Sequence, residues 1–185
     1  MKRLAFLLFT SIAFAPSAES QISAGTFRVW AGAGYGSFGC WESFRCDSFV
    51  FGEARQVFSG FVGGAKAISR FVEAGAELTT RAKDKGGMTF AQRSVSAVLI
   101  VHPPIVSNLG LRGSFGRAFL SQSGQVDDML ISDRRSGRSG TVGISYDLRF
   151  MRRLSVTPGF EIGGVDFGSE RASKMWEYRL ALTWQ

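Results

Sequence analysis

The segment KMWEYRLALTW, residues 174–184, alternates between two kinds of side chain along its length. Large apolar residues take every second position, and smaller or polar residues stand between them: Trp176, Tyr178, Leu180, Leu182 and Trp184 against Glu177, Arg179, Ala181 and Thr183. Since successive side chains of a strand point to opposite faces, this pattern predicts a β-strand with one apolar face. The apolar face is aromatic at both ends, as in strands that cross a bilayer whose two interfaces favour Trp and Tyr.

Seven earlier segments also have strand character: residues 27–38, 58–69, 70–82, 88–102, 109–120, 140–150 and 154–166. Each is near or above the ~9–11 residues that a tilted strand needs to cross a membrane. Together with residues 174–184, they predict an all-β chain of eight antiparallel strands.

The connections between these segments differ in length. The link Ser69–Arg70 and residues 102–108 and 151–153 are short, whereas residues 39–57 and 121–139 are long and polar. With the N-terminus in the periplasm, every short connection except residues 83–87 falls on the periplasmic side, and both long connections lie outside. Outer-membrane barrels have this asymmetry.

Closure of the sheet is expected because backbone N–H and C=O groups find no water in hydrocarbon, so open edges are costly. The sequence therefore predicts an eight-stranded antiparallel transmembrane β-barrel, an up-and-down meander whose interior is filled by side chains. Its inward faces would carry a network of paired charges: Lys66, Glu73, Glu77, Arg112, Asp147, Arg149, Glu161, Glu177 and Arg179. The alternative is a soluble, lipocalin-like carrier, in which the inner face is apolar and the outer face polar.

The N-terminus has the layout of a signal peptide over residues 1–20. Lys2 and Arg3 precede the short apolar run 4–15, and small residues allow cleavage after Ala18 or Ser20. The barrel domain would then span residues 21–185.

The only two cysteines, Cys40 and Cys46, are close in sequence, and an oxidising compartment would allow a disulfide between them. The alternative, a metal site, lacks ligands because no His is nearby. We expect no cofactor.

The formal net charge of +7 arises from basic residues dispersed over the chain, which argues against nucleic acid as a partner. Anionic lipid and lipopolysaccharide phosphates are the expected partners of an exported basic chain. Arg134, Arg135 and Arg138 in the stretch 121–139 are candidates for a lipopolysaccharide contact. The other interpretation is that both long stretches are strand extensions with solvated tips.

Three motifs, FRVWAGAGYGSF (27–38), GTVGISYDLRF (140–150) and EYRLALTW (177–184), resemble the small OmpA/OmpX-type outer-membrane β-barrels of the porin family. The resemblance implies an outer-membrane location. It also implies that Tyr178, Leu180, Leu182 and Trp184 form the C-terminal signal that the barrel-assembly machinery reads. Such a signal normally ends in Phe or Trp, and Gln185 departs from this pattern. Members of the group serve as anchors, adhesins, small channels and surface enzymes.

Two enzyme types use small outer-membrane barrels, lipid A deacylases and lipid A palmitoyltransferases. A resemblance to either would imply a His with a Ser near the outer surface. The only His, His102, is expected at the periplasmic side, and Pro104 stands where the deacylase pattern has Ser. His102 is therefore interpreted as a turn or interface residue. We expect a non-enzymatic monomer with a role in envelope structure or surface interaction. Its alternatives are a narrow channel for small, including hydrophobic, solutes, a lipid A-modifying enzyme, and the soluble carrier.

Overall fold

The computed structural model describes residues 24–40, 55–85, 88–126, 129–168 and 172–185. Its strands are β1 (Phe27–Cys40), β2 (Arg55–Ser69), β3 (Val72–Lys85), β4 (Met88–Val101), β5 (Leu109–Val126), β6 (Met129–Tyr146), β7 (Leu148–Met151), β8 (Leu154–Asp166) and β9 (Ala172–Trp184). In the described part of the chain, no helix has the length and apolar character needed to cross a membrane.

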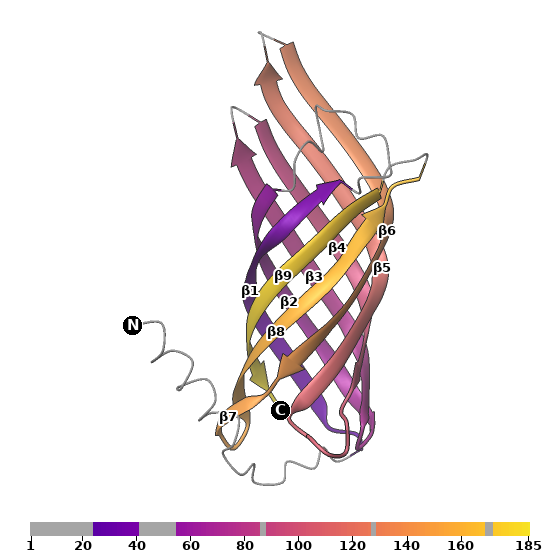
Figure 1. Ribbon diagram of the computed structural model, residues 1–185, viewed down its shortest axis with the longest axis vertical. Helices are drawn as coiled ribbons and strands as arrows, with labels where there is room; N and C mark the ends of the chain where they lie inside the picture. The colour runs from indigo at the N-terminus through magenta and orange to yellow at the C-terminus, as the bar shows by residue number, and fades with distance from the viewer. Residues whose placement is uncertain (1–23, 41–54, 86–87, 127–128, 169–171) are drawn as a thin grey trace.

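The sheet closes on itself as an antiparallel barrel (Figure 1). Consecutive strands from β1 to β6 pair with one another, β8 pairs with β9, and two further pairings, β1 with β9 and β6 with β8, complete the circle. The short β7 continues β6 along the edge of β8, so the barrel wall has eight strands. The predicted eight-stranded up-and-down meander is confirmed.

The break between β6 and β7 at Asp147 has a local cause. The Asp147 N–H donates to the Asn108 carbonyl at 2.9 Å, on the β5 side. Since the backbone groups of successive strand residues point to opposite sides, those of Tyr146 face β8, where the register places Pro158. Proline has no N–H to donate, so one hydrogen bond of the ladder is missing there. The register of β6 and of β7 against β8 is the same on both sides of the break.

The two ends of the barrel differ. At one end the connections are residues 70–71, 102–108 and 152–153, and we call it the turn end. At the opposite end, the loop end, the β3–β4 and β5–β6 hairpins extend beyond the other strands (Figure 1). β5 and β6 stay paired up to Val126 and Met129, so most of the stretch 121–139 is a strand extension. This agrees with the second interpretation of that stretch.

The wall of the barrel is apolar outside and polar inside. In β9, every second residue from Ser173 to Thr183 is buried and every residue between them is exposed. The exposed ones include the large apolar side chains Trp176, Leu180 and Leu182. Acidic and basic side chains on other strands are buried in the lumen, Glu73 with 1% of its surface exposed.

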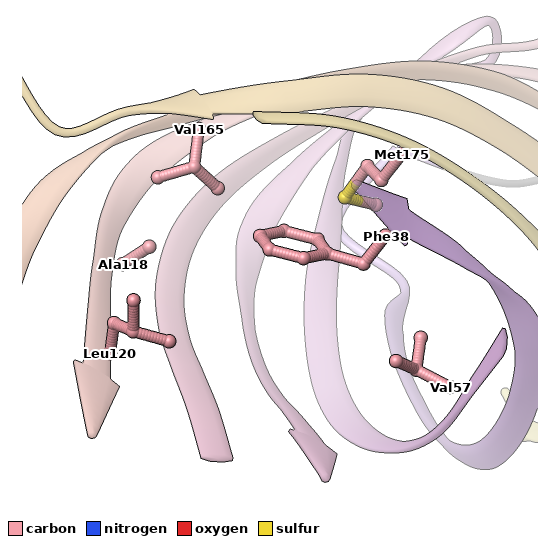
Figure 2. Close-up of a cluster of buried hydrophobic side chains, with 6 residues drawn as sticks. All are labelled: Phe38, Val57, Ala118, Leu120, Val165 and Met175. Carbon is pink, nitrogen blue, oxygen red and sulfur yellow. The ribbon is translucent and has the colours of Figure 1, made fainter. Parts of the chain in front are cut away.

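A cluster of apolar side chains fills the lumen near the loop end (Figure 2). We call it the apolar cap, and it consists of Phe38, Val57, Ala118, Leu120, Val165 and Met175 from five strands. Phe90 packs against the cap, with its ring centroid 5.7 Å from that of Phe38. A second apolar cluster around Trp30 and Phe61 lies among the luminal charges.

Candidate functional site

At the turn end, Arg28, Glu73, His102 and Asp147 form a buried group that we call the turn-end cluster. Arg28 Nη1 lies 3.3 Å from Glu73 Oε1, and Arg28 Nη2 lies 2.6 Å from Asp147 Oδ1. His102 Nε2 lies 2.8 Å from the same Glu73 oxygen, and Nδ1 lies 3.2 Å from the Leu109 carbonyl. These contacts tie β1 and β3 to the β4–β5 turn and to the β6–β7 junction.

Farther into the lumen, Glu77, Arg112, Glu161 and Arg179 form a ring of alternating charges that we call the central cluster. Glu77 Oε2 lies 2.7 Å from Arg112 Nη2 and 2.8 Å from Arg179 Nη2. Glu161 Oε1 lies 2.6 Å from Arg112 Nε and 2.5 Å from Arg179 Nη1. Since buried charges are tolerated only when they are well paired, each member depends on the others.

Aromatic rings complete the surroundings of the two arginines. The guanidinium carbon of Arg179 lies 3.6 Å from the centroid of the Phe61 ring, and that of Arg112 lies 5.3 Å from the Trp30 ring. Attraction of a cation to a ring face is stronger where water is excluded. The Trp30 indole also donates to Glu77 Oε2 at 2.7 Å. The cations are thus packed as well as paired.

A third group of charges, the ion pair of Arg81 with Glu177, lies on the loop-end side of the central cluster. Arg81 Nη2 is 2.7 Å from Glu177 Oε2, and the Ser59 hydroxyl donates to Glu177 Oε1 at 2.6 Å. Arg179 Nε lies 3.8 Å from the same carboxylate and links this pair to the central cluster. We call the three groups together the charge network; they lie along the lumen below the apolar cap, and Arg179 links the central cluster to the Arg81–Glu177 pair.

The structure brings seven of the predicted luminal residues into these contacts: Glu73, Glu77, Arg112, Asp147, Glu161, Glu177 and Arg179. It places Lys66 elsewhere. Lys66 is exposed on the outer face of β2, whereas its neighbours Ala65 and Ala67 are buried in the lumen. The prediction for Lys66 was wrong because this segment has small residues on both faces, so the alternation does not identify the inner one.

Arg149 also lies outside the network. It is exposed at the turn end, where its Nη2 donates to Gln185 Oε1 at 2.8 Å. The prediction placed it on the inward face, and its partner across β8 is the buried Ser155. The Arg149 guanidinium turns away from the interior and contacts Gln185, the residue after the last strand.

Sequence reasoning missed Arg28 and Arg81 and did not foresee that His102 would join the network. Arg81 has the same alternation as Glu73 and Glu77, eight and four residues away, so its inward position was available from the sequence. Arg28 precedes a Gly-rich stretch in which the pattern is weak. With Arg28 and Arg81 in place of Lys66 and Arg149, the network again has four basic residues and five carboxylates.

One small cavity lies in the lumen among the charged clusters. This cavity of about 40 Å³ borders Arg28, Arg112, Glu161 and Thr157. Such a volume holds about three water molecules, at roughly 10–15 Å³ for each. It is too small for a metabolite, and among the described residues no group of His, Cys, Asp and Glu side chains could hold a metal ion.

The His102 ring has no nucleophile beside it. Its two nitrogens contact Glu73 and the Leu109 carbonyl, and within the described residues neither contacts a serine hydroxyl. His102 itself is buried, with 3% of its surface exposed. A Ser–His pair of the kind used in acyl transfer is thus not formed at this position.

The arginines proposed for lipopolysaccharide do not share one face. Arg134 and Arg138 are exposed on the outer face of β6, and Arg135 is half-buried on the opposite face. The outward Tyr178, Leu180, Leu182 and Trp184 of β9 are exposed, and their reading as an assembly signal stays a prediction. Residues 1–20, Cys46 and the Cys40 side chain lie outside the description, so the signal peptide and the disulfide also stay predictions.

No family model matches the sequence, and no curated protein matches it. The fold is similar to that of Ail, the attachment invasion locus protein of Yersinia pestis, with a TM-score of 0.60 and 10% identity over 87% of this chain and 99% of that one. The N-terminal β-barrel domain of Pseudomonas aeruginosa OprF has a TM-score of 0.57 and 14% identity, over 88% and 100%.

Neisserial surface protein A is similar as well, with a TM-score of 0.55 and 14% identity over 84% of this chain and 96% of that one. All three are covered almost completely, so the likeness includes the whole barrel and not one hairpin. The chain therefore has the fold of the small eight-stranded outer-membrane β-barrels of the OmpA/OmpX type.

Proposed function

We propose that the protein is a non-enzymatic outer-membrane barrel that acts in envelope structure or in contacts at the cell surface. The observation that carries the proposal is the polarity of the wall, which is apolar on the exposed face and charged on the buried face. A soluble barrel has the reverse arrangement. In a bilayer, the exposed apolar side chains would face lipid and need no partner protein.

A row of aromatic side chains on the outer face supports a lipid environment. Phe58, Tyr35, Tyr178 and Phe160 stand in register across β2, β1, β9 and β8. The rings of Tyr35 and Phe58 lie 5.2 Å apart, and those of Phe160 and Tyr178 lie 5.1 Å apart. This row crosses the seam between the first and last strands, where the barrel closes, so it strengthens the seam without burial in a protein core.

The contents of the lumen support a closed barrel over a channel. The charge network spans the lumen, and the apolar cap lies between it and the loop end. An ion entering from the loop end would have to pass the apolar side chains of Phe38 and Leu120 before it reached the charge network. The closed barrel would then serve as a scaffold for its outer wall and its long hairpins.

The remaining proposals follow from an outer-membrane location. Residues 1–20 would direct export, and the outward residues at the end of β9 would be read by the barrel-assembly machinery. Outer-membrane lipid and lipopolysaccharide would be the partners of the mature monomer. Arg134 and Arg138 are exposed on the outer face of β6, and they would meet lipopolysaccharide phosphates.

Membrane fractionation and heat-modifiable gel mobility test the proposal together. We expect the full chain to fractionate with membranes, to need detergent for extraction, and to migrate differently before and after boiling. Planar bilayers that contain the folded protein should show no stepwise conductance. A chain that stays in solution without detergent would contradict the proposal, and reproducible conductance steps would favour the narrow channel.

A further inference from the structure

On three neighbouring strands, an outward arginine follows apolar residues of the outer wall on the loop-end side. The outward residues of β4 run through Leu99 and Val95 to Arg93, and those of β5 run through Phe115 to Arg117. On β6, Val142 is followed by Arg138 after one glycine. All three arginines are exposed, and we call them the basic border; on β5 the exposed Phe119 continues the outer face beyond Arg117.

The three arginines are also close to one another. Arg117 and Arg138 stand directly opposite in the register of β5 and β6, and Arg93 is diagonal to Arg117, which pairs with Val95. Directly opposite side chains have Cβ atoms ~4.5–5.5 Å apart, and like charges at such positions destabilise a sheet. Within the described chain, the side chains of Arg117 and Arg138 have no ion pair or hydrogen bond.

One acid stands beside this group. Asp166 of β8 pairs in register with Arg138, and its Oδ1 accepts the Gly168 N–H at 2.8 Å. Among the described side chains of this face, three guanidinium groups and a single carboxylate leave an excess of positive charge. An external anion with several oxygens would relieve the repulsion, and guanidinium groups bind phosphate in a forked geometry.

Directly toward the turn end, the wall is hollowed. Gly113 and Gly140 face outward there; a Cβ added at Gly113 would meet nothing within 4 Å, and at Gly140 only the Ser114 carbonyl at 3.7 Å. Two open hollows of about 550 and 530 Å³ meet at this place and share Val142 and Ile162. The surface thus combines a cationic border with an apolar trough below it.

The other side of the barrel offers an internal comparison. Gly60 of β2 also faces outward with nothing within 4 Å of an added Cβ. The next outward residue toward the loop end is Phe58, which is uncharged and 71% exposed. The opening at Gly60 therefore has no arginine beside it on the loop-end side. Only the β4–β6 side combines a trough at outward glycines with a basic border, among the described residues.

We propose that this face binds a phosphorylated lipid of the outer leaflet, with the chemistry of lipid A. Arg93, Arg117 and Arg138 would bind a phosphate group, and an acyl chain would lie in the trough at Gly113 and Gly140. The proposal rests on the outer-membrane location and names the surface on which lipopolysaccharide is held. Of the three arginines predicted from the sequence it keeps Arg138. It adds Arg93 and Arg117 and leaves out Arg134 and Arg135, the second of which faces the other way.

The test uses the full folded protein in detergent micelles, titrated with purified lipid A. We expect Arg117→Gln with Arg138→Gln to weaken binding about tenfold, because two charge-assisted contacts are lost. Gly113→Leu with Gly140→Leu should weaken it by a similar factor through the trough alone. The matched controls are Arg152→Gln with Arg153→Gln, which removes the same charge at the turn end, and Gly60→Leu, which fills the other opening. Neither control should change the affinity.

Two further arms identify the chemistry. Dephosphorylated lipid A should bind the wild-type protein about tenfold more weakly than lipid A. Phosphatidylglycerol that binds as tightly as lipid A would overturn the proposal, as would unchanged lipid A affinity in both double variants. A wild-type protein that inserts into bilayers and shows heat-modifiable mobility, yet does not bind lipid A, would refute this inference and leave the proposed function standing.

Discussion

The central cluster and the apolar cap fill neighbouring levels of one lumen by opposite means. In the central cluster, two arginines and two glutamates hold one another at 2.5–2.8 Å. In the cap, Phe38, Leu120 and Met175 pack as apolar side chains and exclude water. Loss of one charge leaves its partners buried and uncompensated, whereas loss of one apolar side chain leaves only a cavity.

The difference shows which level specifies the closed form. The central cluster joins Glu77 of β3, Arg112 of β5, Glu161 of β8 and Arg179 of β9 across the lumen. A slip of one residue in any of these strands would turn its charge toward lipid, so the cluster penalises wrong registers. Substitution of one apolar residue of the cap by another is tolerated more easily, because these side chains fill volume and form no specific pairs.

The largest effect is expected from Arg179→Ala. The change removes the cation that contacts Glu77, Glu161 and Glu177, and it should lower the free energy of unfolding by about 3–5 kcal/mol. Urea unfolding in detergent, followed by Trp fluorescence, measures it. The double variant Arg179→Met with Glu161→Gln should recover part of the loss, because one uncompensated carboxylate is also removed. Equal losses in the single and double variants would argue against the pairing.

A smaller loss is expected in the apolar cap. Leu120→Ala should cost about 2–3 kcal/mol in the same urea experiment, because it leaves a cavity among apolar neighbours. Planar bilayers should still show no conductance, since the charge network below the cap is unchanged. A loss greater than that of Arg179→Ala would reverse the ranking of the two levels.

The smallest effect is expected at Lys66. Lys66→Ala should change the free energy of unfolding by less than about 0.5 kcal/mol, because the side chain lies on the outer face near the turn end. Its ammonium group can reach the membrane interface along the flexible stem. A loss above about 2 kcal/mol would place Lys66 back in the lumen and make it a member of the network.

The number of strands and their closure followed from the sequence because a bilayer imposes a simple rule. Each crossing needs apolar residues at every second position, and β9 obeys it throughout, with burial alternating from Ser173 to Thr183. The rule fails where both faces carry small residues, as at Lys66 in β2 and Arg28 in β1. The rule applies only to residues that cross the bilayer. The paired extension of β5 and β6 to Val126 and Met129 has no such alternation of apolar residues, so the sequence did not predict it.

Contacts between distant positions could not be derived from alternation alone. The sequence offered no partner for Gln185, yet its N–H donates to the Arg153 carbonyl at 2.9 Å and its side chain accepts from Arg149. The residue after Trp184 thus ties the closing strand to the β7–β8 turn. His102 likewise finds Glu73 only because β3 and β4 are paired in one particular register.

Spin labels on the outer face of β9 test the inverted polarity of the wall. Each label would replace one outward residue of the full chain in lipid bilayers, in a background with Cys40→Ser and Cys46→Ser: Trp176, Tyr178, Leu180, Leu182 or Trp184. We expect collisions with oxygen to exceed those with a water-soluble nickel chelate, most strongly at Leu180 and least at the two tryptophans. Equal and high accessibility to the chelate at all five positions would contradict a membrane-spanning barrel.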